Sequence, residues 1–264
     1  MPDGRTLQVA SVHHYRDQWA KAFGVKYEDD SGEQKYVHQT TYGMSERLLG
    51  ATVATHGDDQ GLLMPPSIAP IQVVVVPILS KEGSDEIISA AHEIVRKLKS
   101  EKIRVKLDDR DIRPGQKYYD WEIKGVPLRI ELGPRDLKSN SFMCAARGGN
   151  KSSHSIDDLL PSVKEELNLV NNYMKEKAKE HFNQHIKKMP NLKIHGSTIS
   201  LEEELEEGYV YEMAFDGNDA EAEAIEKETG FSFLGVSTNA YSEERKCIIS
   251  GRPTNNRVFL AKTY

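Results

Sequence analysis

The pattern of hydrophobic and polar positions divides the first part of the chain into two kinds of segment. An alternating, strand-like run at 36–41 is followed by a turn at Gly43 and then by an amphipathic helix. A loop rich in glycine and aspartate comes next, at 56–61, and then the pair Pro65-Pro66. Beyond the prolines, Val73–Val76 are consecutive β-branched residues, which predict a strand buried on both faces. One unit is therefore predicted to end at the prolines, and an α/β unit to begin after them.

The residues before 36 contain shorter elements. The pattern predicts a strand at 6–10 and a helix at 15–23, with Ser11 as a capping residue between them. A polar segment at 28–35 contains Ser and Gly and predicts a hairpin connection. The run at 36–41 would then return as the antiparallel partner strand.

After the prolines the pattern alternates between strands and helices, which indicates a mixed sheet with helices packed on it. The predicted elements after Val73–Val76 are a helix at 85–100 capped by Ser84, a strand at 104–107, a helix at 116–124, and strands at 128–132 and 142–146.

The longest predicted helix covers 155–189. Ser155 and Asp158 form a capping-box-like start, and Pro190 is expected to end the helix. Apolar residues recur along it at helical spacing, which indicates packing. They are Leu160, Val163, Leu167, Val170, Met174, Phe182 and Ile186. A small unit with its own core follows this helix.

Composition limits the kind of protein this is. With 264 residues the chain is long enough for two or more compact units. The net charge of −6 argues against a surface that coats nucleic acid generally, so any RNA binding must use a local patch. The two cysteines, Cys144 and Cys247, indicate a reducing compartment. No apolar run is long enough to span a membrane, and no signal peptide is recognised, so we expect a cytoplasmic protein.

Arg47 is the first candidate for chemistry. It lies near the start of a helix that follows a glycine-containing turn. Helix amides, the helix dipole and a forked guanidinium together favour a phosphate group. The alternative, on this pattern alone, is a surface arginine on an amphipathic helix.

A longer motif around Arg47 identifies a family. The motif consists of Gln39, Thr40, Thr41, Tyr42, Gly43, Met44, Ser45 and Arg47, then His56-Gly57-Asp58-Asp59 and Pro65-Pro66. It resembles the third signature motif of class II aminoacyl-tRNA synthetases, in the form found in prolyl-tRNA synthetases of the archaeal and eukaryotic type. The sequence departs from that family at Tyr42, where the family usually has tryptophan; the aromatic wall is kept.

The resemblance implies that residues 1–66 are the C-terminal part of a class II catalytic domain, with its antiparallel sheet. Arg47 would be catalytic, neutralising the γ-phosphate and the leaving pyrophosphate. The ATP, bound with Mg²⁺ as a substrate, would be held by Gln8, Gln39, Thr40 and Arg47. Proline would be bordered by Ser11, His13 and Thr41. Val12 and His14 depart from the family's Ser and Tyr.

Residues 67–152 resemble the α/β anticodon-binding domain, with its mixed sheet, that is shared by the synthetases for His, Gly, Thr and Pro. The strings Arg113-Pro-Gly-Gln-Lys117 and Trp121-Glu122, with Gly133-Pro-Arg-Asp136, point to proline. A carboxylate and an arginine can together bond to the edge of an unstacked guanine. We expect Glu122 and Arg129 to read the anticodon, and Arg113, Lys117 and Trp121 to hold or stack on the loop. The alternative is that Trp121 belongs to the core and Glu122 is a solvated helix charge.

The sequence supports two interpretations of one further segment and predicts no zinc in another. The turn Arg147–Lys151 is basic; it either touches tRNA phosphate or is a linker into the next helix. Residues 153–264 combine the long helix with a small α+β unit that resembles the family's C-terminal zinc domain. Only Cys247 remains of the expected thiols, with Asp216 and Ser250 in place of others, so no zinc and no metal-ligating residues are predicted for this chain.

The fold class predicted is therefore multidomain, α/β and α+β. The resemblance implies a proline–tRNA ligase that activates proline with ATP and transfers it to its tRNA, as a homodimer. The first two signature motifs have no counterpart in these 264 residues. We therefore expect the chain alone to be catalytically incomplete. The alternative is a non-catalytic tRNA-binding module or accessory subunit.

Overall fold

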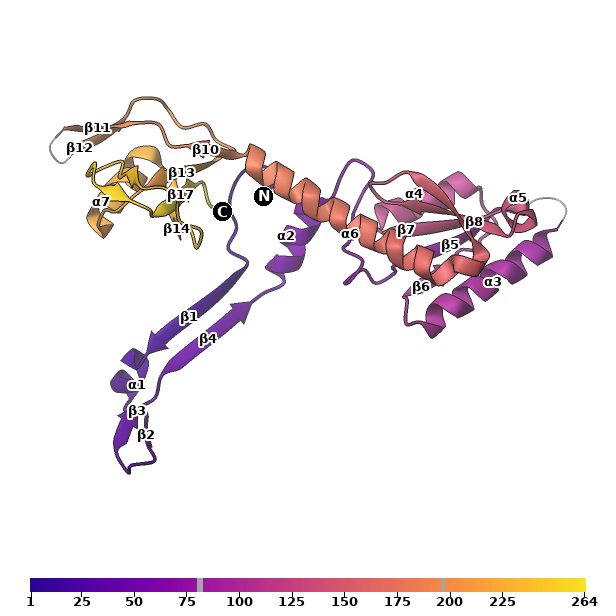
Figure 1. Ribbon diagram of the computed structural model, residues 1–264, viewed down its shortest axis with the longest axis horizontal. Helices are drawn as coiled ribbons and strands as arrows, with labels where there is room; N and C mark the ends of the chain where they lie inside the picture. The colour runs from indigo at the N-terminus through magenta and orange to yellow at the C-terminus, as the bar shows by residue number, and fades with distance from the viewer. Residues whose placement is uncertain (80–82, 196–197) are drawn as a thin grey trace. The chain divides into compact units, whose positions relative to one another are not determined.

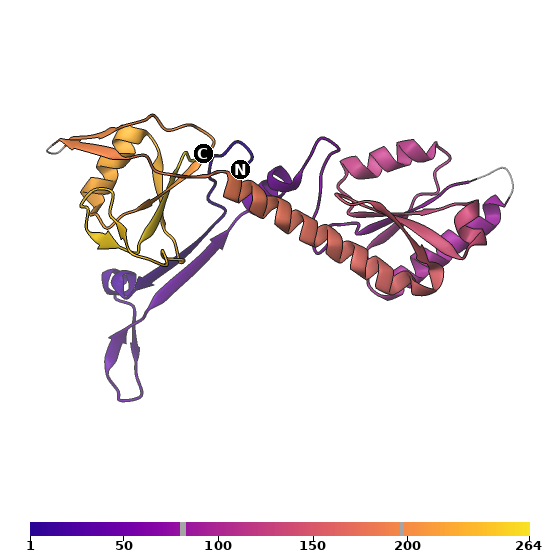
Figure 2. The same cartoon turned by 45° about the horizontal axis from the view of Figure 1, so that its top comes forward.

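The computed structural model describes residues 1–79, 83–195 and 198–264, which form two compact units. One unit consists of Met1–Thr52 together with Ile186–Tyr264, and the other is Val53–His185. Figures 1 and 2 show two views of the chain. Within the described ranges, no helix is both long enough and apolar enough to cross a membrane.

A mixed five-stranded sheet forms the centre of the unit Val53–His185, as the sequence predicted. The strand order is β6-β5-β7-β8-β9, in which β5 is parallel to β6 and β7, while β8 is antiparallel to both β7 and β9. The strands are β5 Val73–Pro77, β6 Val105–Leu107, β7 Leu128–Leu132, β8 Ser141–Ala146 and β9 Lys151–Ser155.

Helices cover both faces of this sheet (Figure 1). On one face, α3 (Ser84–Ser100) and α6 (Leu159–Gln184) pack over a core that includes Val73 and Val75. On the other face, α4 (Pro114–Ile123) packs with Val74 and Val76. The alternation follows from the two-residue period of a strand. All residues of β5 are buried, which confirms the prediction for this run.

The start of α3 and the end of α4 depend on glycines. Gly83 is the N-cap of α3 with φ of +78°, so Ser84 is the first helical residue and the prediction that it caps the helix is wrong. Gly125, after α4, has φ of +74°, and a Cβ there would lie 2.7 Å from the Cβ of Leu62. The segment before β5 therefore packs closely against the end of α4.

The elements of this unit differ from the prediction in three places. A short helix, α5 (Pro134–Lys138), precedes β8 and was not predicted. The segment expected to lead directly into the long helix forms strand β9, followed by a 3-10 turn at Ile156–Asp158. The long helix ends at Gln184 instead of 189, because the residues after it form β10 (Ile186–Lys188), which pairs in parallel with another strand. Tertiary pairing thus overrides helical periodicity at Ile186.

The N-terminal segment forms two small antiparallel ladders. The predicted strand at 6–10 is wrong: β1 covers Ala10–Arg16 and pairs with β4, Gln39–Met44. Ser11 therefore lies within a strand and does not cap a helix. Between them lie α1 (Gln18–Phe23), β2 (Lys26–Glu28) and β3 (Gln34–Tyr36). The last two form the predicted hairpin. After β4, α2 covers Arg47–His56.

The C-terminal residues form a four-stranded sheet in the order β10-β13-β17-β14, with α7 (Asp219–Thr229) against it. The helix begins with a capping box formed by Asn218 and Glu221 and ends at Gly230, which has φ of +64°. The remaining strands are β11 Leu192–His195, β12 Thr198–Leu201, β13 Val210–Ala214, β14 Ser232–Val236, β15 Arg245–Lys246, β16 Pro253–Thr254 and β17 Arg257–Ala261.

Candidate functional site

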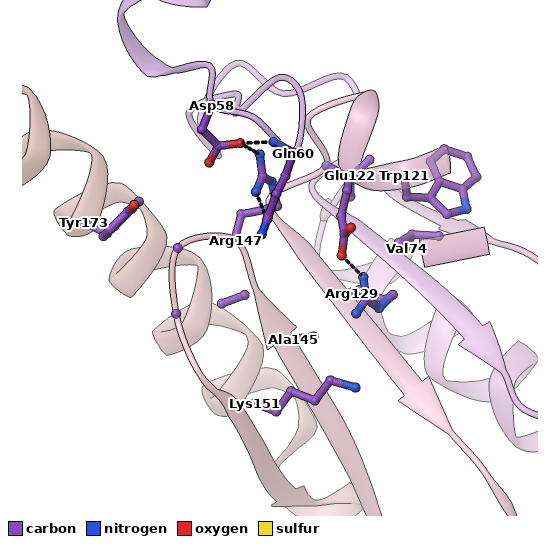
Figure 3. Close-up of a pocket in the computed structure, with 14 residues that line it drawn as sticks. Asp58, Gln60, Val74, Trp121, Glu122, Arg129, Ala145, Arg147, Lys151 and Tyr173 are labelled. Atoms are coloured by element: carbon purple, nitrogen blue, oxygen red, sulfur yellow. Dashed lines mark hydrogen bonds and ion pairs between the residues drawn. The ribbon is translucent and has the colours of Figure 1, made fainter. Parts of the chain in front are cut away.

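Charged side chains form a row across three strands on the α4 face of the central sheet (Figure 3). The register places Arg129 of β7 opposite Ala145 of β8, and Ala145 opposite Lys151 of β9. Glu131 lies two residues after Arg129 and therefore on the same face. Ala145 contributes only a methyl group between Arg129 and Lys151, and all three residues line one cavity.

The guanidinium of Arg129 is held by two carboxylates and an aromatic ring. Its Nη1 donates to Oε1 of Glu122 at 2.8 Å, and its Nε donates to Oε1 of Glu131 at 3.0 Å. The guanidinium carbon lies 3.9 Å from the centre of the Tyr118 ring. The Arg129 side chain is 10% exposed and that of Glu122 is 31% exposed. The arginine is therefore rigidly placed, while the glutamate beside it is open to a ligand.

Glu131 and Tyr118 complete this arrangement. Lys151 Nζ donates to Oε2 of Glu131 at 2.9 Å. Burial, assisted by the Glu131 carboxylate, raises the pKa of Tyr118 to about 12. The phenol therefore stays neutral at physiological pH, and its ring offers a flat surface beside a fixed positive charge.

A cavity of about 310 Å³ lies next to this row. Its lining includes Glu122, Arg129, Lys151 and Arg147. Such a cavity holds an acceptor, Glu122, beside a planar donor, Arg129. Single-stranded bases are bound by this combination of edge hydrogen bonds and stacking planes.

Arg147 joins this site to the loop after α2. Its Nη2 donates to Oδ1 of Asp58 at 2.8 Å and to the carbonyl of Leu62 at 3.1 Å. Its Nη1 donates to Oε1 of Gln60 at 2.6 Å. The residue is 6% exposed, and its Nε has no hydrogen-bond partner among the described residues. Sequence reasoning missed this buried cluster, because its members lie more than eighty residues apart.

The basic segment after β8 is the turn of a hairpin. It connects β8 to β9, so the alternative that it is a linker into the long helix is wrong. Gly148 has φ of +75°, and a Cβ there would lie 2.1 Å from the Tyr173 ring of α6. The turn is thus fixed against the helix by a position that only glycine fits.

Asp108 anchors α4 beneath the site. Its Oδ2 accepts from Nε1 of Trp121 at 2.7 Å, and its backbone carbonyl accepts from Nζ of Lys117 at 3.1 Å. Both of these residues are buried. Burial raises the pKa of Asp108, but hydrogen bonds from Arg110 and Trp121 outweigh it and lower the pKa to about 2. Arg113, by contrast, is exposed at the start of α4.

The residues predicted for ATP and proline lie in the unit that contains Met1–Thr52, in two groups. Arg47, the first residue of α2, donates from Nη1 to the carbonyl of Gln8 at 3.0 Å. In the β1–β4 ladder, His13 lies directly opposite Thr41. Two further predicted residues, Thr40 and Gln39, pair with His14 and Arg16, and Ser11 pairs with Gly43.

Much of this ladder is uncovered. Large apolar side chains are exposed on β1, β4 and α2; they are Val12, Tyr42, Met44, Leu48 and Leu49. Exposed apolar surface of this extent marks a contact area. Apart from Gln8, which precedes β1, the predicted ATP and proline residues lie on the same elements.

The sequence predicts no metal ligands, and in the C-terminal part Cys247 is buried, with its Sγ accepting from the amide of Asp216 at 3.3 Å. The described residues bring potential ligands together elsewhere. Cys144, His154 and Glu166, in the unit Val53–His185, place a sulfur, a nitrogen and an oxygen within 4.8 Å of one another.

Comparison with known proteins agrees with this fold. Residues 72–166 match the family of anticodon binding domains, and this range contains the central sheet with its charged row. Residues 200–264 match the family "Prolyl-tRNA synthetase, C-terminal". The chain thus matches the C-terminal part of prolyl-tRNA synthetase of the archaeal type.

Relatives cover the whole chain. It is 42% identical over 272 residues to the proline–tRNA ligase of Thermococcus kodakarensis, with 100% of this chain and 55% of the relative covered. It is 41% identical over 266 residues to that of Methanosarcina mazei, with 100% and 54% covered. The chain therefore spans about half the length of the curated relatives it matches.

Proposed function

We propose that this chain recognises the anticodon of proline tRNA, as part of a prolyl-tRNA synthetase, through Glu122 and Arg129. The observation that carries the proposal is their pairing at 2.8 Å beside a cavity, on the sheet of the domain that matches anticodon-binding domains. The anticodons for proline share two guanines, which our sequence interpretation already assigned to these two residues.

The chemistry of guanine fits this pair. The carboxylate of Glu122 accepts from the N1 and N2 protons of an unstacked guanine, while Arg129 donates to O6 or N7. Arg129 keeps its bond to Glu131 during this exchange, so only the bond to Glu122 has to open. The Tyr118 ring, already against the guanidinium, keeps that plane in position.

The remaining predicted anticodon residues take two different roles. Arg113 is exposed at the start of α4 and is free to bind the RNA backbone. Lys117 and Trp121 are buried against Asp108 and act by positioning α4, on which Glu122 lies.

In the whole enzyme, we propose that the N-terminal residues contribute to activation of proline. The proline carboxylate attacks the α-phosphate of ATP, which forms prolyl-adenylate and releases pyrophosphate; the terminal ribose hydroxyl of the tRNA then takes proline and releases AMP. Arg47 would stabilise the γ-phosphate and pyrophosphate, and ATP would enter with Mg²⁺. Gln8, Gln39 and Thr40 would hold the nucleotide, and Ser11, His13 and Thr41 would border proline.

This proposal divides the chain at 66 and 152, with the catalytic part before 66, and assigns the enzyme to the cytoplasm as a homodimer. The exposed apolar residues of β1, β4 and α2 would be covered by the remaining part of the catalytic domain. Arg47 is exposed, and its guanidinium donates to the backbone carbonyl of Gln8, which ATP phosphate can replace.

The test is binding of the 264-residue chain to proline tRNA and to transcripts in which each anticodon guanine is replaced by adenine. We expect each replacement to weaken binding about ten-fold or more. Glu122→Gln and Arg129→Lys should lose this discrimination, while Glu165→Gln, exposed on α6, should keep it. Equal affinity of the unaltered chain for all transcripts would reject the proposal.

A second assay separates enzyme from module. Proline-dependent exchange of pyrophosphate with ATP would be measured for the chain alone and with the rest of the catalytic domain added. Exchange only with the added part supports a divided active site. Tight tRNA binding without exchange in either case would leave the accessory module.

A further inference from the structure

Three side chains with metal-binding atoms meet on the face of the central sheet opposite Arg129 and Lys151. Cys144 lies on β8, His154 on β9 and Glu166 on α6. The register places Cys144 opposite Ser152, and His154 follows two residues later on the same face of β9. The site proposed above for RNA uses none of them.

Burial of Glu166 requires a compensating charge. The residue is 5% exposed, and its Oε1 accepts from the Ser152 hydroxyl and lies 2.8 Å from Nε2 of His154. Throughout residues 1–79, 83–195 and 198–264, no lysine or arginine forms an ion pair with it. A buried carboxylate is stable when it is paired with a cation or coordinates a metal. The cluster contains no permanent cation to fill that need.

A nucleophilic role for this cluster is excluded by burial. The side chain of Cys144 is fully buried. Burial, together with the Glu166 carboxylate, raises the pKa of the Cys144 thiol to about 12. A thiol that is protonated and enclosed does not attack a substrate.

We infer that Cys144, His154 and Glu166 form a binding site for zinc. Thiolate, imidazole and carboxylate are the three ligand types that zinc takes from proteins. Ligand atoms at 2.0 to 2.3 Å from a tetrahedral ion lie roughly 3.3 to 3.7 Å apart. The three ligand atoms already lie within 4.8 Å of one another, so side-chain movements of about 1 Å bring them into position.

The charges also fit. A divalent ion between a thiolate and a carboxylate is neutralised, and Glu166 gains a permanent positive charge beside it. The thiol proton leaves to solvent when the ion binds. A fourth ligand position remains for water or for the hydroxyl of Ser152, which already contacts both Glu166 and His154.

An ion can reach the cluster. A cavity of about 350 Å³ is lined by Ser152 and Glu166, together with Lys151 and Tyr173. The side chain of His154 is 21% exposed. Access therefore comes between the β8–β9 hairpin and α6.

A bound ion would join β8, β9 and α6 at one point. The hairpin that carries Lys151 on its other face would be held to the long helix by coordinate bonds. Zinc should then raise the thermal midpoint of unfolding of this unit, because it binds the folded state only. This inference does not depend on the anticodon proposal, since it concerns the opposite face.

The test uses the intact 264-residue chain, freed of metal with a chelator and then titrated with Co²⁺ and Zn²⁺. We expect about one ion per chain, and for Co²⁺ a sulfur-to-metal charge-transfer band together with visible bands of a tetrahedral site. Zinc should displace cobalt and abolish these bands.

Matched variants locate the ion. Cys144→Ser should abolish the charge-transfer band, and His154→Gln and Glu166→Gln should weaken binding at least ten-fold. Cys247→Ser, His92→Gln and Glu165→Gln change the same residue types at other positions and should leave binding unchanged. Circular dichroism verifies that each variant is folded.

Two results would overturn the inference. One is the absence of binding to the unaltered chain at micromolar Co²⁺ or Zn²⁺, which would make the cluster a hydrogen-bonded network alone. The other is a thiolate band that survives Cys144→Ser and disappears in Cys247→Ser, which would place the ion in the C-terminal part. Because the unaltered chain gives the spectrum, failure of a variant to fold does not prevent a decision.

Discussion

The guanidinium of Arg147 lies 2.8 Å from the carboxylate of Asp58 and fixes the loop after α2 to the hairpin between β8 and β9. Asp58 follows α2 and Arg147 follows β8, so the two partners come from segments that are far apart in the sequence. The pair is enclosed at the arginine and partly open at the aspartate, with side-chain exposures of 5% and 25%.

Removal of this arginine should destabilise the unit strongly. Arg147→Ala leaves Asp58 without its cation and also removes the donors to Gln60 and Leu62. We expect the free energy of unfolding to fall by about 3 kcal/mol, at the low end for a broken buried pair because Asp58 is partly solvated. Chemical denaturation measures this. Arg96→Ala, at an exposed pair on α3, should change stability by less than about 1 kcal/mol. Equal losses in the two variants would show that the buried Arg147 cluster contributes no more than an exposed pair.

Two adjacent glycines should differ sharply. Gly148→Ala combines a left-handed backbone with a clash at 2.1 Å against the Tyr173 ring, so we expect a loss of about 2 kcal/mol or more. At Gly149 the nearest atom to an added Cβ is 3.5 Å away, and its φ is not positive. Gly149→Ala should therefore cost less than about 1 kcal/mol. Thermal unfolding of both variants measures the two losses. Equal losses would show that the turn adjusts freely around Tyr173.

Low pH should weaken the contact between the Asp108 carboxylate and Trp121, which holds α4 in place. The Asp108 carboxyl has a pKa of about 2 in the folded protein, below its ordinary value near 3.9 in an unfolded chain. Folding is therefore favoured by its ionisation above pH about 4, and this contribution is lost as the pH falls toward about 2. Asp108→Asn should make the free energy of unfolding depend less on pH between these values. Asp109→Asn, at an exposed neighbour, should leave that dependence unchanged.

Fluorescence provides the readout for this experiment. The chain has two tryptophans, Trp19 and Trp121, so Trp19→Phe leaves the indole that donates to Asp108 as the reporter. An identical pH dependence in Asp108→Asn and in the unaltered chain would show that other carboxyls dominate.

The proposed role of Arg47 predicts a selective loss of chemistry. In the complete enzyme, Arg47→Ala should lower proline-dependent pyrophosphate exchange at least 100-fold, because its positive charge would no longer face the departing phosphates. Binding of tRNA should be retained. Lys21→Ala removes an exposed charge on α1 and should leave exchange unchanged. Exchange that persists in Arg47→Ala would remove this residue from the mechanism.

The sequence was most informative where local pattern and tertiary structure agree. Val73–Val76 and Leu128–Leu132 are uninterrupted apolar or alternating runs bounded by turns, and both form central strands. The sequence was least informative where pairing between distant segments determines the secondary structure. The helix-like spacing that includes Ile186 gave no sign that this residue would pair with Val210 in a sheet.

The same limit applies to the sites. Glu122 and Arg129 lie seven residues apart on adjacent elements and were predicted together through a motif. The cluster of Cys144, His154 and Glu166 has no ligand spacing of a known metal motif, because its members come from two strands and a helix. Only the register between β8 and β9 and the packing of α6 bring them together.

Ala145 lines the cavity of the proposed anticodon site. It stands between Arg129 and Lys151 in the register, and neighbouring strands are about 4.8 Å apart, so the backbones that carry the two cations are roughly 10 Å apart. From β8 only the methyl group of Ala145 faces this space, while the Glu131 carboxylate bonds both cations. A branched side chain there would narrow the cavity without altering a single charge, so the proposed site depends on a residue that carries no charge and makes no hydrogen bond to a base.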